Sequence, residues 1–184
     1  ADPTMSVDQV TTFFSLLALV AAAISVATGI SLATTSGRSV LASMGGSPLR
    51  LATAVAATSV AGSLYFSEVA GFRPCELCWY QRIAMYPLAI ILLVAIARPG
   101  GDVARFALPL SISGAAVSIY HYQLQLFPDQ GAVCEPGASC AFRWVHRFGF
   151  ISIPLMAMAG FTAVTALMVA DKRQMATKHR ETTR

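Results

Sequence analysis

The sequence predicts an all-α protein that crosses a membrane several times. Of its 184 residues, 55% are hydrophobic and only 12% are charged, whereas soluble domains carry about 25% charged residues. The mean hydropathy is +0.62. Five stretches are long and apolar enough to span a bilayer, for which about 20 residues suffice. A water-soluble globule is therefore excluded, and little of the chain is left for a soluble domain.

The first predicted span lies in an uncharged stretch of 29 residues between Asp8 and Arg38. Its length allows it to cross a bilayer with some tilt. No Lys or Arg precedes it and its apolar core is too long for a signal peptide, so we interpret it as a membrane helix. Residues 1–4, which precede Met5, have the character of an expression scar and are excluded from the fold.

Four further spans follow and account for most of the remaining chain. The third is interrupted only by Arg82. Pro87, Pro109 and Pro154 fall inside or at the ends of these spans, where membrane helices tolerate proline because neighbouring helices satisfy the freed carbonyls. The predicted ranges are residues 51–67, extended by Leu49 and Val69, and residues 77–97, 106–127 and 148–170.

The distribution of Lys and Arg predicts which side of the membrane each loop occupies, because short cytoplasmic loops keep an excess of these residues. We expect the N-terminus outside, the C-terminus in the cytoplasm and all four cysteines at the extracytoplasmic face of the membrane. One side receives three cations, Arg73, Arg143 and Arg147, and the other receives nine: Arg38, Arg50, Arg98, Arg105, Lys172, Arg173, Lys178, Arg180 and Arg184.

The net charge of +4 does not indicate a nucleic-acid partner. The cations mark loops and form no basic cluster with interleaved aromatic residues. We interpret the basic tail, residues 172–184, as a topology anchor. Disulfides persist outside the cytosol, so the charge pattern and the cysteine content indicate the same side.

The first cysteine pair, Cys75 and Cys78, lies at the start of the third span. Pro74 suits the first turn of a helix, because its missing N–H is not needed there. Backbone N–H groups and the helix dipole at such an end favour a thiolate. Arg82 lies one turn deeper than Cys78 on the same helix face. A guanidinium at membrane depth is costly and indicates function, so Arg82 could hold an anion such as a thiolate or a reduced quinone oxygen.

The second pair, Cys134 and Cys140, lies in a loop of about 20 residues between the last two spans. Pro136 and Gly137 favour a turn between them, which could bring the two Cα atoms to the separation of about 4.4–6.8 Å that a disulfide requires. The loop thus has the features of a small redox loop. The aromatic residues that follow have the pattern of an interfacial belt: Phe142, Trp144, Phe148 and Phe150.

Three kinds of site fit the four cysteines. A zinc site would use them as ligands, although the second spacing is longer than usual. Two structural disulfides would suit an oxidising compartment, although a bridge between residues three apart constrains little chain entropy. A redox relay would pass two electrons and two protons between a dithiol and a membrane quinone. The spacing does not distinguish the direction of that transfer.

Several segments together resemble the DsbB disulfide bond formation proteins, and more closely their short-loop branch called BdbC. The resemblance covers roughly residues 50–170, and the order of its motifs is more specific than the Cys-x-x-Cys alone. The matching segments are residues 74–82 (PCELCWYQR), residues 120–128 (YHYQLQLFP), the loop with Cys134 and Cys140, and residues 148–154 (FGFISIP).

The resemblance implies a membrane enzyme that reoxidises an extracytoplasmic DsbA/BdbD-like thiol oxidase of the thioredoxin fold. Electrons would pass to a membrane quinone, either menaquinone or ubiquinone. By position, Cys134 would be attacked by the partner's thiolate, with Cys140 as its companion. An interloop disulfide between Cys75 and Cys140 would then leave Cys78 as the thiolate that faces the quinone. The resemblance also places Arg82 and His121 beside the quinone ring.

The resemblance implies a four-helix redox domain at residues 48–171. The chain departs from the family in an additional membrane helix, which with a cytoplasmic loop occupies residues 5–47 before this domain. The predicted fold is thus a four-helix transmembrane bundle with an additional N-terminal transmembrane helix, to which we assign no chemical role. A vitamin K epoxide reductase homologue is the alternative enzyme, but there the loop cysteines precede the Cys-x-x-Cys. A non-catalytic membrane protein with structural disulfides is the other alternative.

Overall fold

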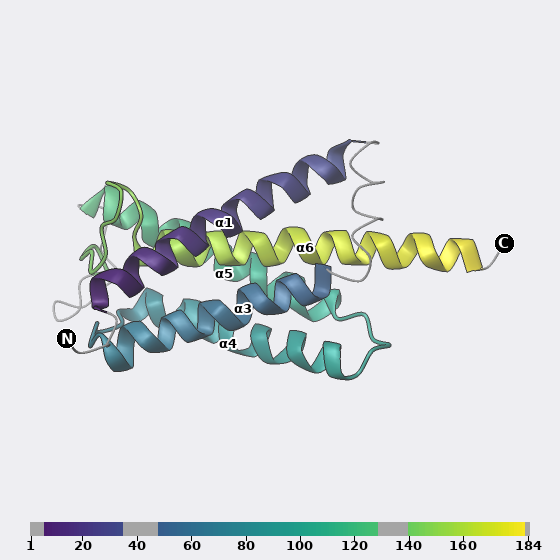
Figure 1. Cartoon of the computed structure of the whole chain (residues 1–184), viewed down its shortest axis with the longest axis horizontal. Coiled ribbons are helices and arrows are strands. Elements are labelled where there is room, and N and C mark those ends of the chain that lie inside the picture. Colours follow the sequence, from purple (N-terminus) through teal and green to yellow (C-terminus); the bar gives the residue numbers. More distant parts are fainter. Residues whose placement is uncertain (1–5, 35–47, 129–139, 183–184) are drawn as a thin grey trace.

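The computed structural model describes residues 6–34, 48–128 and 140–182, which are arranged as a bundle of long helices (Figure 1). Their only β-type pairing is an isolated bridge between Arg147 and Ile151, so the all-α prediction is confirmed for the described residues. The helices are α1 (Val7–Ala33), α3 (Pro48–Leu64), the π-helix η1 (Tyr65–Val69), α4 (Glu76–Ala97), α5 (Ala104–Leu126) and α6 (Ile153–Thr182).

Four of these helical segments are long and apolar enough to cross a membrane: Val7–Ala33, Pro48–Val69, Glu76–Ala97 and Ile153–Thr177. The predicted span at residues 106–127 is also a helix, α5, of 23 residues, but it is too polar to be one of the four. Ser111, Ser118, His121 and Gln125 on α5 are buried inside the protein. A helix can carry such residues among other helices because neighbouring groups satisfy them. The arrangement with five spans therefore stays a prediction.

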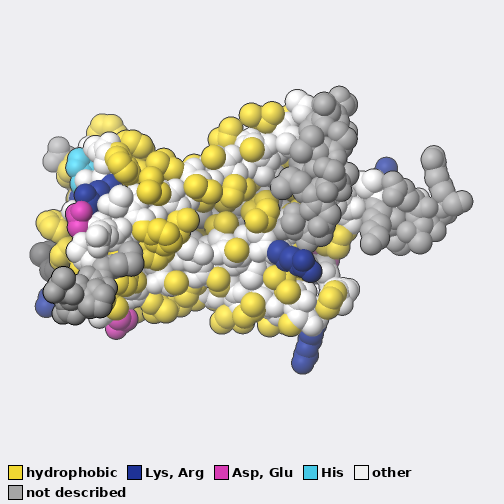
Figure 2. Space-filling view, viewed as in Figure 1, with side chains coloured by type: hydrophobic (Ala, Val, Ile, Leu, Met, Phe, Trp, Pro, Cys, Tyr) yellow, Lys and Arg dark blue, Asp and Glu magenta, His cyan; other side chains and the backbone are white. Residues whose placement is uncertain are grey.

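The outer surface of the bundle has the character of a membrane protein. Figure 2 shows hydrophobic side chains spread over the middle of the molecule, while charged side chains gather toward its two ends. Large apolar residues on α4 and α5 lie on the surface, including Ile83, Ile90 and Phe106, each more than 60% exposed. Exposed apolar area of this extent is unfavourable in water. The chain is therefore a multi-pass membrane protein.

The last helix begins later and ends later than the sequence predicts. The predicted span starts at Phe148, whereas α6 starts at Ile153. Phe148 and Gly149 have φ angles of 51° and 80°, which a right-handed helix does not permit. They form a tight hairpin in which the N–H of Arg147 donates to the carbonyl of Ile151 over 2.9 Å. At its other end α6 continues beyond Ala170 into the basic tail.

The core is built around α6, which packs against α1, α3 and α5. Phe161 of α6 is fully buried, and its ring lies against Gly114 of α5. A Cβ added at Gly114 would lie 2.2 Å from that ring, so only glycine permits this approach of the two helices. Along its other side, α6 packs against α1 through small residues, with Ala21, Ala159 and Ala163 in one buried cluster.

Candidate redox site

The site begins with the two free cysteines at the start of α4. Cys75 is the N-cap residue of the helix, with extended backbone angles, and Cys78 lies in the first turn. Pro74 precedes the N-cap, so it lies just outside the first turn in which the sequence places it. The two sulfur atoms are 3.2 Å apart, against about 2.05 Å in a disulfide. The pair is therefore a dithiol that can close with a small movement.

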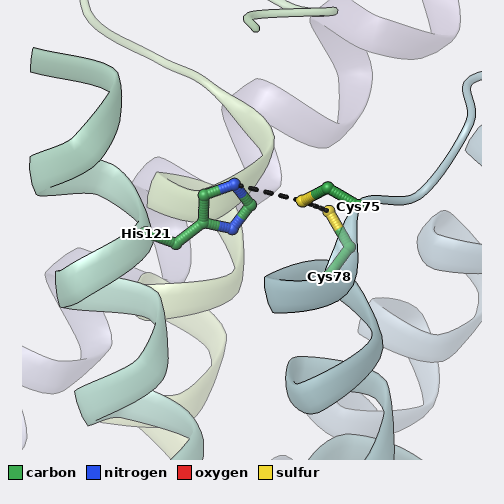
Figure 3. A group of neighbouring side chains, drawn as sticks. All are labelled: Cys75, Cys78 and His121. Carbon is green, nitrogen blue, oxygen red and sulfur yellow. Dashed lines mark hydrogen bonds between the residues drawn. The ribbon is translucent and has the colours of Figure 1, made fainter. Parts of the chain in front are cut away.

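His121 of α5 lies against Cys75, as Figure 3 shows. Its Nε2 atom is 3.6 Å from the Cys75 sulfur and 3.2 Å from the carbonyl oxygen of Cys140. Its Nδ1 atom is 3.4 Å from Nε2 of Gln81. An amide nitrogen only donates, so the contact with Gln81 fits the tautomer in which Nδ1 accepts and the ring N–H lies on Nε2. Gln81 thereby directs the ring N–H toward Cys75 and the Cys140 carbonyl.

These contacts favour a negative charge on Cys75. The hydrogen bond from the Cys78 thiol lowers the pKa of the Cys75 thiol to about 4, although burial of the thiol acts in the opposite direction. The hydrogen bond and positive charge that His121 can supply act in the same sense as Cys78. A thiolate is the reactive form of cysteine in disulfide exchange, so the arrangement favours exchange chemistry at Cys75.

Cys140 comes from the loop before α6 and reaches the same place. It is 2% exposed, is disulfide-bonded and belongs to one buried cluster with Cys75, Leu77 and Leu124. The structure thus brings the backbone of Cys140 beside Cys75. The remaining cysteine of the predicted site, Cys134, lies outside the described residues.

Arg82 lies deeper along α4 and is held by α3. Its Nε and Nη2 atoms donate to the side-chain and backbone oxygens of Ser63, each over 3.0 Å. Its guanidinium carbon lies 5.1 Å from the centre of the Trp79 ring, a cation–π contact. The Ser63 hydroxyl also lies 3.2 Å from that of Tyr86. Ser63 therefore fixes the direction of the guanidinium.

A cavity of about 330 Å³ adjoins both Cys78 and Arg82. Gln81 lines it as well, but most of its wall consists of apolar side chains from α1, α3, α4 and α6. Neither Cys75 nor His121 lines this cavity in the described part of the chain. The resemblance places Arg82 and His121 beside one ring, whereas here Arg82 lies in the cavity wall and His121 lies against Cys75. Cys78 is the residue that connects the two parts.

The zinc alternative depends on which thiols are available. Cys75, Cys78 and His121 each offer a ligand atom, and these atoms lie within 4.8 Å of one another. A four-cysteine site needs four thiolates, but Cys140 is disulfide-bonded. The four-cysteine ligand set considered for the sequence is thus not available in this state of the protein.

Sequence reasoning did not identify two residues of this arrangement. Ser63 is one of several hydroxyl residues in a span rich in small residues, so its place in the sequence does not distinguish it. Gln81 lies inside the 74–82 segment without a predicted role, and its contact with His121 joins residues 40 positions apart. No local pattern reports a contact between such distant positions.

Comparison with known proteins identifies the family. The family described as "Disulfide bond formation protein DsbB" matches residues 47–171 of the chain. The chain belongs to the DsbB family. Membership implies redox enzyme activity in disulfide bond formation. The matched residues contain both cysteine pairs and α3 to α5, while α1 lies outside the match.

Relatives in the family are similar over most of their own length. The "Disulfide bond formation protein C" of Bacillus subtilis is 44% identical over 116 residues, which cover 62% of this chain and 84% of the relative. The "Probable disulfide formation protein C 2" of Bacillus anthracis is 39% identical over 129 residues, covering 68% and 92% respectively. These relatives support the BdbC branch that the motifs indicate. No solved structure matches the chain.

Proposed function

We propose that this DsbB-family protein is a thiol:quinone oxidoreductase that reoxidises a DsbA/BdbD-like thiol oxidase and passes the electrons to a membrane quinone. The observation that supports the proposal is the position of Cys78. It lies 3.2 Å from the Cys75 sulfur and also lines the cavity that contains Arg82. One residue thus belongs both to an exchange-competent dithiol and to a membrane cavity.

The first half of the reaction is thiol–disulfide exchange. A thiolate of the reduced partner attacks Cys134 in the loop disulfide, and Cys140 leaves as a thiolate. The partner's second thiol then closes the partner's own disulfide and releases Cys134. The partner loses two electrons and two protons, and the loop pair becomes a dithiol.

The second exchange passes the electrons from the loop to α4. The Cys140 thiolate attacks Cys75 in a Cys75–Cys78 disulfide, so that Cys75 and Cys140 are bridged and Cys78 becomes a thiolate. Attack by Cys134 on Cys140 restores the loop disulfide and leaves Cys75 and Cys78 reduced. A bridged Cys140 beside free Cys75 and Cys78 corresponds to the state after this step.

His121 would stabilise Cys75 as a thiolate, the form in which Cys75 leaves when Cys134 attacks Cys140. Its ring N–H faces both the Cys75 sulfur and the Cys140 carbonyl. A charge-assisted hydrogen bond of this kind is stronger than one between neutral groups. We therefore assign His121 to the exchange step, because it contacts Cys75 and does not line the cavity.

The cavity residues fit a quinone. Small-molecule sites occupy about 300–1,000 Å³ and combine apolar walls with a few polar groups, and a cavity of about 330 Å³ with Arg82 and Cys78 at its wall meets this description. When bound, a quinone supplies an acceptor for two electrons and two protons. Ser63 engages two of the five N–H donors of Arg82, and Arg82 would hold a quinone oxygen with another.

The membrane orientation belongs to the same proposal. The cysteine end of the bundle would face the extracytoplasmic space, where the partner is located, and the basic tail would lie in the cytoplasm. The two alternatives are less well supported. Family membership argues against a vitamin K epoxide reductase homologue, and the free thiols of Cys75 and Cys78 argue against a purely structural pair.

The test uses the purified protein mixed with a reduced DsbA-type partner and a quinone analogue, with quinone absorbance as the readout. Wild-type protein should reduce the quinone at the expense of partner thiols. Cys78→Ala should abolish quinone reduction while its thermal unfolding changes little. Retention of full activity in this variant would contradict the proposal. Oxidation of quinol with reduction of the partner would show that the reaction runs in the opposite direction.

A further inference from the structure

One wall of the cavity comes from α1, the helix outside the family match. The residues of α1 that line the cavity include Phe14, Leu17, Ala21 and Ile24. They are spaced three or four positions apart and therefore lie along one face of the helix. The remaining walls belong to α3, η1, α4, α6 and the segments that precede α4 and α6, all inside the redox domain. The additional helix thus has a specific place beside the site.

Contacts at the middle of α1 and at its cysteine end determine the position of this face. Toward the middle of the helix, Ala21 packs against Ala159 and Ala163 of α6. At the cysteine end, Asp8 forms an ion pair with Arg147 in the segment before α6. Close to it, Phe14 lies against Gly62 of α3, where an added Cβ would be 2.8 Å from the ring. These contacts hold α1 as a wall.

The cavity is polar at the cysteine end and mostly apolar along the rest of its length, where Thr58 and Ser59 are its polar lining residues. At the cysteine end it is lined by Arg82, Cys78 and Ser63. Farther along α1, the lining changes to Leu17 and Ile24. Phe14 and Ile24 are ten positions apart, which corresponds to about 15 Å along a helix axis. Figure 1 shows α1 inclined to α3, with the two helices diverging in this view toward the C-terminal end of α1.

This shape suits an amphiphile with a polar head and an apolar chain. We propose that α1 forms one wall of a channel for the isoprenoid tail of the quinone, with Leu17 and Ile24 in contact with the tail. The inference rests on the proposed function, because it places the quinone head at Arg82 and Cys78. The cavity is continuous from Cys78 and Arg82 to Ile24. This continuity favours a quinone over a phospholipid, because the head of a quinone reacts with a thiol and the head group of a phospholipid does not.

A photolabelling experiment on the wild-type protein tests this placement directly. The probe is a quinone whose short isoprenoid tail carries a diazirine, and mass spectrometry locates the adducts. Adducts at residues 17–24 of α1 that an unlabelled tailed quinone suppresses would support the channel. Adducts confined to the exposed faces of α4 or α5 would overturn it. Labelling of α1 by a diazirine phospholipid, unaffected by quinone, would instead assign the cavity to lipid.

A pair of neighbouring substitutions gives an independent test. Leu17→Trp places a larger side chain in the channel, whereas Leu16→Trp makes the same change at a residue that is 50% exposed and outside the cavity lining. We expect the factor by which Leu17→Trp raises the KM to be about ten times larger for a tailed quinone than for the tailless head. The Trp side chain would occupy space in the channel, so the tail would lose apolar contact area. Leu16→Trp should change both values equally. Equal changes in Leu17→Trp would overturn the inference.

The two tests separate this inference from the function on which it rests. If the wild-type protein reduces neither quinone, the proposed function fails. If it reduces both and α1 is not labelled, only the role of α1 fails. If Leu17→Trp does not fold, Leu17→Ala replaces it, and we expect a weaker photolabel on α1 together with a KM increase confined to the tailed quinone.

Discussion

The contact between Ser63 and Arg82 yields the most specific prediction. Ser63→Ala removes the hydroxyl that accepts from Nε of Arg82 over 3.0 Å, while the backbone oxygen still accepts from Nη2. A hydrogen bond to a charged group contributes about 1.5–3 kcal/mol. Arg82 is only half-buried, so the lower value is appropriate, and about 1.5 kcal/mol corresponds to about a tenfold change in an equilibrium constant.

We therefore expect Ser63→Ala to raise the KM for quinone about tenfold, because Arg82 keeps only one of its two hydrogen bonds to residue 63 and is held less firmly. The assay follows quinone absorbance at saturating partner concentration. Exchange between the partner and the loop cysteines, measured without quinone by trapping free thiols, should be unchanged. Ser59→Ala is the matched control, since Ser59 also lines the cavity but donates to the Val55 carbonyl. The same KM in Ser63→Ala, Ser59→Ala and wild type would refute the positioning role.

Three further predictions concern the guanidinium, the reactive thiol and the core. Arg82→Lys should raise the quinone KM more than it slows partner oxidation, since Lys lacks the planar fork; unchanged quinone kinetics would contradict this. Alkylation of Cys75 by iodoacetamide, located by mass spectrometry, should stay nearly constant from about pH 8 to pH 5 and halve near pH 4 as the thiolate is protonated; a midpoint near the ordinary thiol pKa would count against it. Gly114→Ala should destabilise the fold by about 1–3 kcal/mol, because its Cβ would overlap the Phe161 ring. Unfolding in detergent measures this loss, and Phe161→Leu in the same chain should restore part of it.

The sequence by itself determined the positions of the helices and of the first cysteine pair. Uncharged runs such as residues 9–37 can be recognised from the sequence, because the hydrophobicity of each residue does not depend on its tertiary contacts. Cys75 and Cys78 are three positions apart at a helix start, so their proximity also follows from local geometry. The start of α6 was predicted incorrectly, because an apolar aromatic run does not distinguish a hairpin at Phe148 from a helix.

Only the tertiary structure decided which helix faces meet. It placed His121 beside Cys75, 46 positions away, and brought Ser63 to Arg82. It also turned one face of α1 toward the cavity, where the sequence assigned that helix no role. The physical reason is that the four most apolar spans carry hydrophobic residues on their outer faces as well as their inner faces, so hydrophobicity does not identify an inner face. Small residues such as Gly62 and Gly114 permit another helix to approach closely. Which helix approaches at each glycine is determined by packing between segments that are distant in the sequence.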